Sequence, residues 1–182
     1  MLRNIALASL FALLTFAAPA PSAEAASARE IDGGTHETLE RFFNKIGGAR
    51  ELASKSVGLL VFPSVVKAGF GVGGEYGEGA LLVRGDTVGY YNSVSASIGF
   101  QLGVQERSVI IAFMTPQALA QFRQTAGWKI GADASVAIIT VGIGGSIDTN
   151  KITSPVVGFI LDPKGLMYNL TLEGSKISRI DP

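Results

Sequence analysis

The chain has 182 residues, of which 47% are hydrophobic and 16% charged, with 15 basic and 15 acidic side chains. This length suits one domain with a sizeable core, and the neutral balance excludes a general attraction to nucleic acid. The absence of cysteine and the single histidine exclude a disulfide framework and leave little material for a zinc site or a serine–histidine pair. We therefore expect a binding or structural protein rather than an enzyme, with no metal or other cofactor.

Residues 1–25 are predicted to be a secretory signal peptide. Arg3 precedes an apolar run over residues 5–18, which is shorter than the ~20 residues that a membrane-spanning helix needs. Residues 23–25, Ala-Glu-Ala, fit the small-residue pattern of a cleavage site. The sequence thus predicts an exported protein that is periplasmic, peripheral to the membrane or secreted. An uncleaved amphipathic anchor is the alternative.

Residues 26–56 are predicted to be helical. One apolar face repeats at helical spacing through Leu39, Phe42, Phe43 and Ile46. We expect this helix to open near Thr35 and His36 and to end at Gly47-Gly48, and residues 50–55 to add a short helix.

This helical segment has two interpretations. Five basic residues lie near its apolar face in the sequence: Arg41, Lys45, Arg50, Lys55 and Lys67. A basic helix with bulky apolar residues can lie in a membrane interface. Composition favours the other interpretation, in which the apolar face packs on a sheet. Both hold if the helix docks through its carboxyl end and offers its basic residues to a lipid headgroup.

Residues 57–182 form a β-rich region. Candidate strands cover residues 57–62, 68–74, 79–84, 87–93, 95–104, 108–114, 132–139, 141–147, 156–162, 166–172 and 175–180. Residues 84–86 and 162–165 are predicted to be hairpin turns. One helix is inserted near residues 115–125, where Thr115 can cap it and Pro116 suits its first turn. The predicted fold is α+β, with amino-terminal helices on a strongly curved antiparallel sheet that is barrel- or sandwich-like.

The glycine-rich stretch at residues 69–79 allows two kinds of structure. Residues 69–74 match G-x-G-x-x-G, but a dinucleotide site requires this motif to open a helix. The following residues contain further glycines and then a strand pattern, so we favour a curved sheet with bends or close backbone contacts. Glu75 and Glu78 are expected to be solvated side chains on this hairpin.

Six blocks of sequence, in order along the chain, resemble the SYLF family of lipid-binding domains. They are residues 58–79 (GLLVFPSVVKAGFGVGGEYGEG), 90–105 (YYNSVSASIGFQLGVQ), 113–122 (FMTPQALAQF), 127–137 (GWKIGADASVA), 155–160 (PVVGFI) and 165–177 (GLMYNLTLEGSKI). The resemblance covers residues 36–180, and bacterial members that are similar to this chain carry export signals and often stand alone.

The resemblance implies a non-catalytic domain that binds phospholipid; some eukaryotic members prefer phosphoinositides, and some fungal members bind actin. For this chain we expect anionic phospholipid, or the membrane surface of a bacterial cell envelope, as the partner. The expected lipid contacts are Arg41, Phe42, Phe43, Lys45, Arg50, Lys55 and Lys67. The alternative is an envelope protein-interaction or structural module that binds its partner through an exposed sheet edge.

Overall fold

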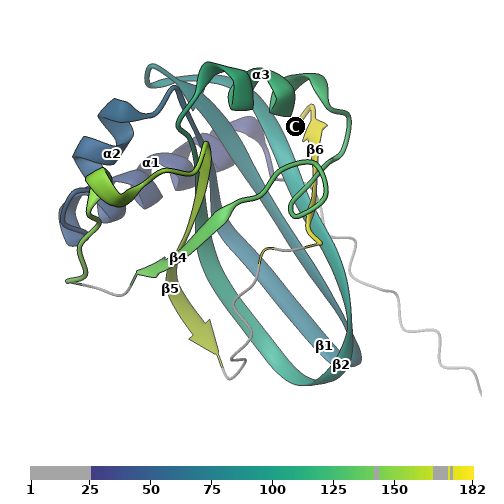
Figure 1. Cartoon of the computed structure of the whole chain (residues 1–182). Helices are drawn as coiled ribbons and strands as arrows, with labels where there is room; N and C mark the ends of the chain where they lie inside the picture. The colour runs from purple at the N-terminus through teal and green to yellow at the C-terminus, as the bar shows by residue number, and fades with distance from the viewer. Residues whose placement is uncertain (1–25, 142–143, 166–171, 173) are drawn as a thin grey trace, which may run out of the picture.

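The computed structural model describes residues 26–182 except 142–143, 166–171 and 173 (Figure 1). The helices are α1 (Ala28–Lys45), α2 (Ala49–Lys55), α3 (Pro116–Gln124) and the 3-10 turn η1 (Thr149–Lys151). The strands are β1 (Gly58–Val83), β2 (Asp86–Phe113), β3 (Trp128–Lys129), β4 (Ala137–Val141), β5 (Val156–Gly165) and β6 (Lys176–Ile180). They form one sheet in the order β3-β6-β2-β5-β4, with β1 paired to β2. The predicted α+β fold with a strongly curved sheet is confirmed.

The dominant element is one very long hairpin. β1 and β2 have 26 and 28 residues and join through a two-residue turn at Arg84 and Gly85, as predicted. Both turn residues have positive φ, 55° and 91°, as the hairpin turn that matches strand twist requires. The start of β2 pairs with β6 and its end pairs with β5. Figure 1 shows both strands bending together, far from the turn, and running back towards the helices.

Six predicted short strands are therefore segments of two long ones, which corrects the prediction. The ladder continues through register shifts at 62/65, 70/72 and 81/82 instead of ending at the glycine-rich and proline-containing positions. A bulge bends a strand without ending its pairing. The glycines mark bends in this hairpin, as the curved-sheet interpretation predicts.

Two glycines also allow the strand to touch itself. A Cβ on Gly79 would lie 2.1 Å from the carbonyl oxygen of Val61, and one on Gly77 would lie 2.7 Å from that of Ser64. Such distances are far inside van der Waals contact, so only glycine permits the two halves of β1 to approach this closely. The predicted close approach of another backbone is confirmed.

Three local predictions were wrong. Of the predicted strands 132–139 and 141–147, only residues 137–141 form a strand, β4, among the described residues. The sheet is mixed, because β4 pairs in parallel with β5. Residues 162–165 are not a hairpin turn but the end of β5, where Lys164 pairs with Glu106 across a register shift. Asp162 has a φ of 46°, so the turn chemistry produces a bulge within the strand. Most of the predicted strand 166–172 lies outside the described residues.

The helices begin and end for identifiable reasons. α1 starts at Ala28, earlier than predicted, because Ser27 and Glu30 form a capping box in which the Ser27 N–H donates to the Glu30 carboxylate over 2.8 Å. α3 begins as predicted, with the Ala118 N–H donating to Thr115 Oγ1 over 3.2 Å. None of the helices in the described ranges is apolar and long enough to cross a bilayer.

Alternating side chains of the long strands supply two cores. Leu60 and Phe62 face a core that α3 covers with Phe122. Leu59 and Val61, between and beside them, face a second core that α1 and α2 cover. Both faces of the sheet are therefore buried at the end that carries the helices, as the strand period of two requires.

Candidate functional site

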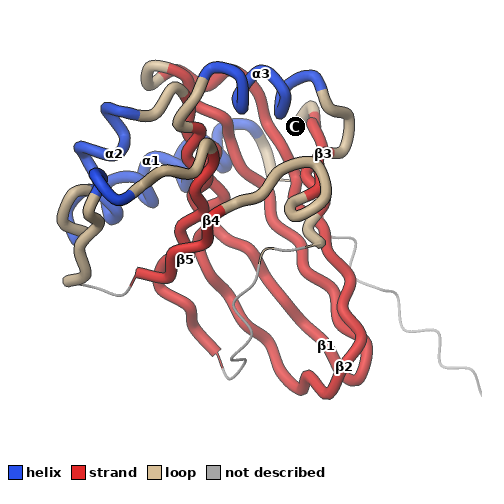
Figure 2. The backbone as a smooth tube through the Cα atoms, in the orientation of Figure 1, coloured by secondary structure: helices blue, strands red, loops and turns tan. Residues whose placement is uncertain are grey.

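A groove of about 980 Å³ opens where the helices meet the hairpin turn. Figure 2 shows α2, α3 and the β1–β2 turn at the same end of the molecule. The apolar residues that line the groove include Leu39, Phe43, Val57, Leu59, Leu82, Val83 and Leu119. The ionisable residues that line it are His36, Glu40, Arg50, Arg84 and Arg123. We call this site the arginine groove.

Three elements each contribute one arginine. Arg50 lies on α2, Arg84 in the turn between β1 and β2, and Arg123 in the last turn of α3. None of the three is in an ion pair among the described residues. Glu40 is the only acidic side chain in the described lining. The groove therefore combines apolar walls with an excess of positive charge.

The Arg50 guanidinium is held in position by the Phe43 ring and the Asn44 side chain. The Arg50 guanidinium lies 5.1 Å from the centroid of the Phe43 ring, and its Nη2 donates to Asn44 Oδ1 over 3.0 Å. A cation over an aromatic face gains attraction while its remaining N–H groups stay available. Arginine can donate two parallel hydrogen bonds to a phosphate or a carboxylate. The groove is thus chemically suited to an anionic headgroup attached to an apolar body.

The structure places some of the predicted lipid contacts at the arginine groove and others away from it. Phe43 and Arg50 line the arginine groove, and Lys45 is exposed at the end of α1. Phe42 is only 1% exposed and packs on Phe159 with ring centroids 5.5 Å apart, so it belongs to the core under α1. Phe42 could not enter a membrane unless α1 left the sheet.

Arg41 is half-buried beside β2. Its Nη2 donates to Ser108 Oγ over 3.1 Å and to Thr38 Oγ1 over 3.2 Å. Ser108 in turn donates to the carbonyl oxygen of Pro63 over 2.7 Å. These bonds tie α1 to the bulge in β1, which gives Arg41 a structural position away from the groove lining.

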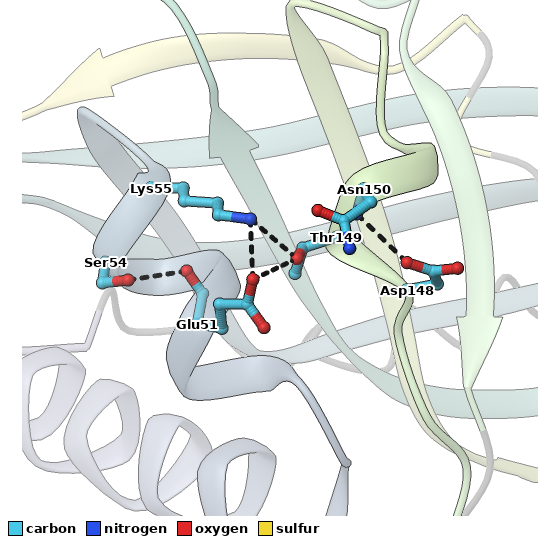
Figure 3. A network of polar contacts seen from close by, with 6 residues as sticks. All are labelled: Glu51, Ser54, Lys55, Asp148, Thr149 and Asn150. Carbon is cyan, nitrogen blue, oxygen red and sulfur yellow. Dashed lines mark hydrogen bonds and ion pairs between the residues drawn. The ribbon is translucent and has the colours of Figure 1, made fainter.

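Lys55 ties α2 to η1 (Figure 3). Its Nζ donates to Glu51 Oε1 over 2.6 Å and to Thr149 Oγ1 over 2.9 Å, and the Thr149 hydroxyl donates to the same Glu51 oxygen over 2.6 Å. The hydrogen bonds from Lys55 and then Thr149 lower the pKa of Glu51, with a smaller contribution from the Lys55 charge. Asp148 Oδ1 completes the network by accepting from the Asn150 N–H over 3.1 Å.

Lys67 and Glu75 lie inside the bent hairpin. Arg107 Nη2 donates to Glu75 Oε2 over 2.7 Å, and both side chains are buried. Burial raises the pKa of Glu75, while the nearby charges of Arg107 and Lys67 oppose that rise. The expectation of a solvated Glu75 is wrong because the glycine-rich bend turns this face of β1 inwards. Glu78 is half-buried and accepts from the Ala26 N–H over 2.8 Å.

Arg84 and Arg123 are not among the site residues predicted from the sequence. The turn and the helix that carry them were both predicted, but their proximity depends on the way the hairpin bends back. A turn arginine and a helix-terminal arginine carry no local signal that they share a groove with Arg50. Within the described ranges, no group of three or more His, Cys, Asp or Glu side chains could hold a metal ion.

Comparison with known families gives one match. Residues 94–181 match the family model described as Ysc84, Las17-binding protein actin regulator. No curated protein matches the chain. The matched region includes most of β2, α3 with Arg123, and all strands that follow.

Proposed function

Because the chain belongs through residues 94–181 to the Ysc84 or SYLF family, whose members bind actin and lipids, we propose that it is an anionic-phospholipid-binding domain. The arginine groove is the proposed binding site. Family membership supports a binding role, since these domains are not known as enzymes. The finer assignment to anionic phospholipid comes from the chemistry of this groove.

One observation carries the proposal: three arginines from separate elements surround an apolar groove, and none is in an ion pair among the described residues. A phospholipid matches both properties of the groove. Its phosphate can accept hydrogen bonds from the guanidinium groups, and its glycerol and acyl portions can contact apolar residues such as Leu39 and Leu119.

The cellular setting is part of the same proposal. The predicted signal peptide would place the domain in the bacterial envelope, at the periplasmic face of a membrane or outside it. Such an envelope would offer anionic phospholipids other than phosphoinositides as ligands, and it would offer no actin. The protein-interaction alternative predicts no preference between vesicles of different charge.

A vesicle flotation assay tests the proposal. Both the full chain and the form beginning at Ala26 are mixed with neutral phosphatidylcholine vesicles or with vesicles that contain phosphatidylglycerol. Each basic residue near an anionic surface contributes about 1 kcal/mol. Arg84→Gln with Arg123→Gln should therefore weaken binding to anionic vesicles by roughly 30-fold.

The matched control is Lys129→Gln with Lys164→Gln, which removes the same charge from exposed positions outside the groove lining. This control should keep most of the affinity. Equal losses in both double variants would show only a general charge effect and would refute the groove as the site. Equal binding to neutral and anionic vesicles would refute the electrostatic proposal altogether.

A further inference from the structure

A second surface lies on the outer face of the bent hairpin. The four large apolar side chains that are most exposed in the described ranges all lie on β1 and β2: Val66 (42%), Tyr76 (45%), Val94 (44%) and Val104 (62%). Tyr76 and Val94 are direct cross-strand partners, so they form one continuous patch. Exposed apolar residues that gather in this way mark an interaction surface more often than scattered ones do.

Three of these residues line a groove of about 700 Å³. Val66, Tyr76 and Val94 form part of its wall, and Ile31 from α1 forms another part. This volume lies within the range of roughly 300–1,000 Å³ that is typical of ligand pockets. We call it the hairpin groove; Val104 lies outside its lining.

The charge of the hairpin groove is opposite to that of the arginine groove. Its described lining contains Glu30, Glu75 and Glu78 and no basic residue. Glu75 is neutralised by Arg107, which leaves Glu30 and Glu78 at the rim. The N–H and hydroxyl groups of Ser27 lower the pKa of Glu30, so this carboxylate stays ionised at neutral pH. An anionic membrane would be repelled by such a rim.

The Glu78 carboxylate accepts two hydrogen bonds at the rim of the hairpin groove, and one of them comes from a main-chain N–H. Its Oε2 accepts the main-chain N–H of Ala26 over 2.8 Å, and its Oε1 accepts the Tyr76 hydroxyl. A peptide N–H can therefore reach this carboxylate while apolar side chains lie over Tyr76 and Val94.

We propose that the hairpin groove binds a segment of a partner protein in which apolar residues alternate with lysine or arginine. Apolar side chains of the segment would cover Val66, Tyr76 and Val94, and its cations would meet Glu30 and Glu78. The site is independent of the arginine groove, so the domain could hold a lipid at one end and a protein at the other. The occupied surface is a sheet face, not the sheet edge that the sequence suggested.

Fluorescence anisotropy with defined peptides tests the inference. The probe is an acetylated, dye-labelled hexapeptide of alternating lysine and valine. Two matched peptides replace its lysines with glutamate or its valines with serine. Saturable binding of the first, at least tenfold tighter than either other peptide, is expected. Equal affinity for all three peptides, or no binding of any, would overturn the proposal.

Substitutions locate the binding. Tyr76→Thr with Val94→Thr keeps strand propensity but removes the apolar surface, and should weaken the lysine–valine peptide at least tenfold. Val104→Thr removes a more exposed valine outside the groove and should change nothing. Glu78→Lys should reverse the preference, so that the glutamate–valine peptide binds better.

Three other occupants are distinguishable. A concentration-dependent dimer that Tyr76→Thr with Val94→Thr abolishes would show that a second copy fills the groove. Loss of vesicle binding in the same variant would assign the patch to a membrane. Peptide binding by the form beginning at Ala26 but not by the full chain would assign it to residues 1–25. Each result would overturn the partner-protein proposal.

Discussion

The arginine groove and the hairpin groove are assembled in opposite ways. The arginine groove takes its charges from α2, a hairpin turn and α3, at positions 50, 84 and 123. The hairpin groove takes most of its wall from β1, with Val94 of β2 beside its cross-strand partner Tyr76. The first is built from elements far apart in the chain, whereas the second is built from the two halves of β1, a cross-strand pair with β2, and the start of α1.

The difference explains how a neutral chain can carry two charged sites. Fifteen basic and fifteen acidic residues cancel over the whole sequence, yet the bend in the hairpin separates arginines at the helix end from glutamates along the outer face. Net charge therefore excludes only a global attraction. Local binding follows from where the fold gathers each sign.

The largest expected effect separates two adjacent phenylalanines beside the arginine groove. Phe42→Ala should lower the free energy of unfolding by about 3–5 kcal/mol, because it empties a buried site. Phe43→Ala should cost less stability, because Phe43 is half-buried, but should weaken anionic-vesicle binding more. Urea denaturation and vesicle flotation measure the two quantities.

Phe42→Leu is a second variant for the case in which Phe42→Ala does not fold. It keeps most of the buried volume, so it should remain folded and bind vesicles like the unmodified chain. If Phe42→Leu lost vesicle binding while Phe43→Ala kept it, the assignment of these two side chains would be reversed.

The long hairpin shows what sequence patterns can and cannot predict. The density of glycine in residues 69–79 predicted curvature, and the turn at Arg84-Gly85 was predicted from local chemistry. The continuity of β1 was missed because a bulge and a strand end have the same local signal of glycine or proline. The inward direction of Glu75 depends on that bend, and so does the approach of Arg84 to Arg123. Both arise from contacts between residues far apart in the chain.

An intermediate effect tests the self-contact that bends the hairpin. Gly79→Ala should lower the free energy of unfolding by roughly 1–3 kcal/mol, because its Cβ would press on the Val61 carbonyl oxygen. Gly33→Ala is the matched control: it lies in α1 with nothing within 4 Å of its added methyl group. The control should be stabilising by about 0.5–1 kcal/mol. Equal effects of the two substitutions in urea denaturation would contradict the close approach of the two halves of β1.

The smallest expected effect concerns the link between α2 and η1, which borders the arginine groove. The hydrogen bonds from Lys55 and Thr149 hold the pKa of Glu51 below its ordinary value of 4.5. A group with a depressed pKa stabilises the fold above its unfolded-state pKa, and loses that contribution as pH falls through its folded-state pKa. Glu51→Gln should therefore lower the melting temperature slightly at pH 7, and the difference should shrink as pH falls below 4.5 and vanish once Glu51 is protonated in the folded protein. Glu37→Gln, at an exposed position of α1 with no ion pair among the described residues, should show no such pH-dependent difference. A difference for Glu51→Gln that persisted undiminished in acid would mean that Glu51 stabilises the link between α2 and η1 as a neutral group, and that its charge contributes nothing to the fold.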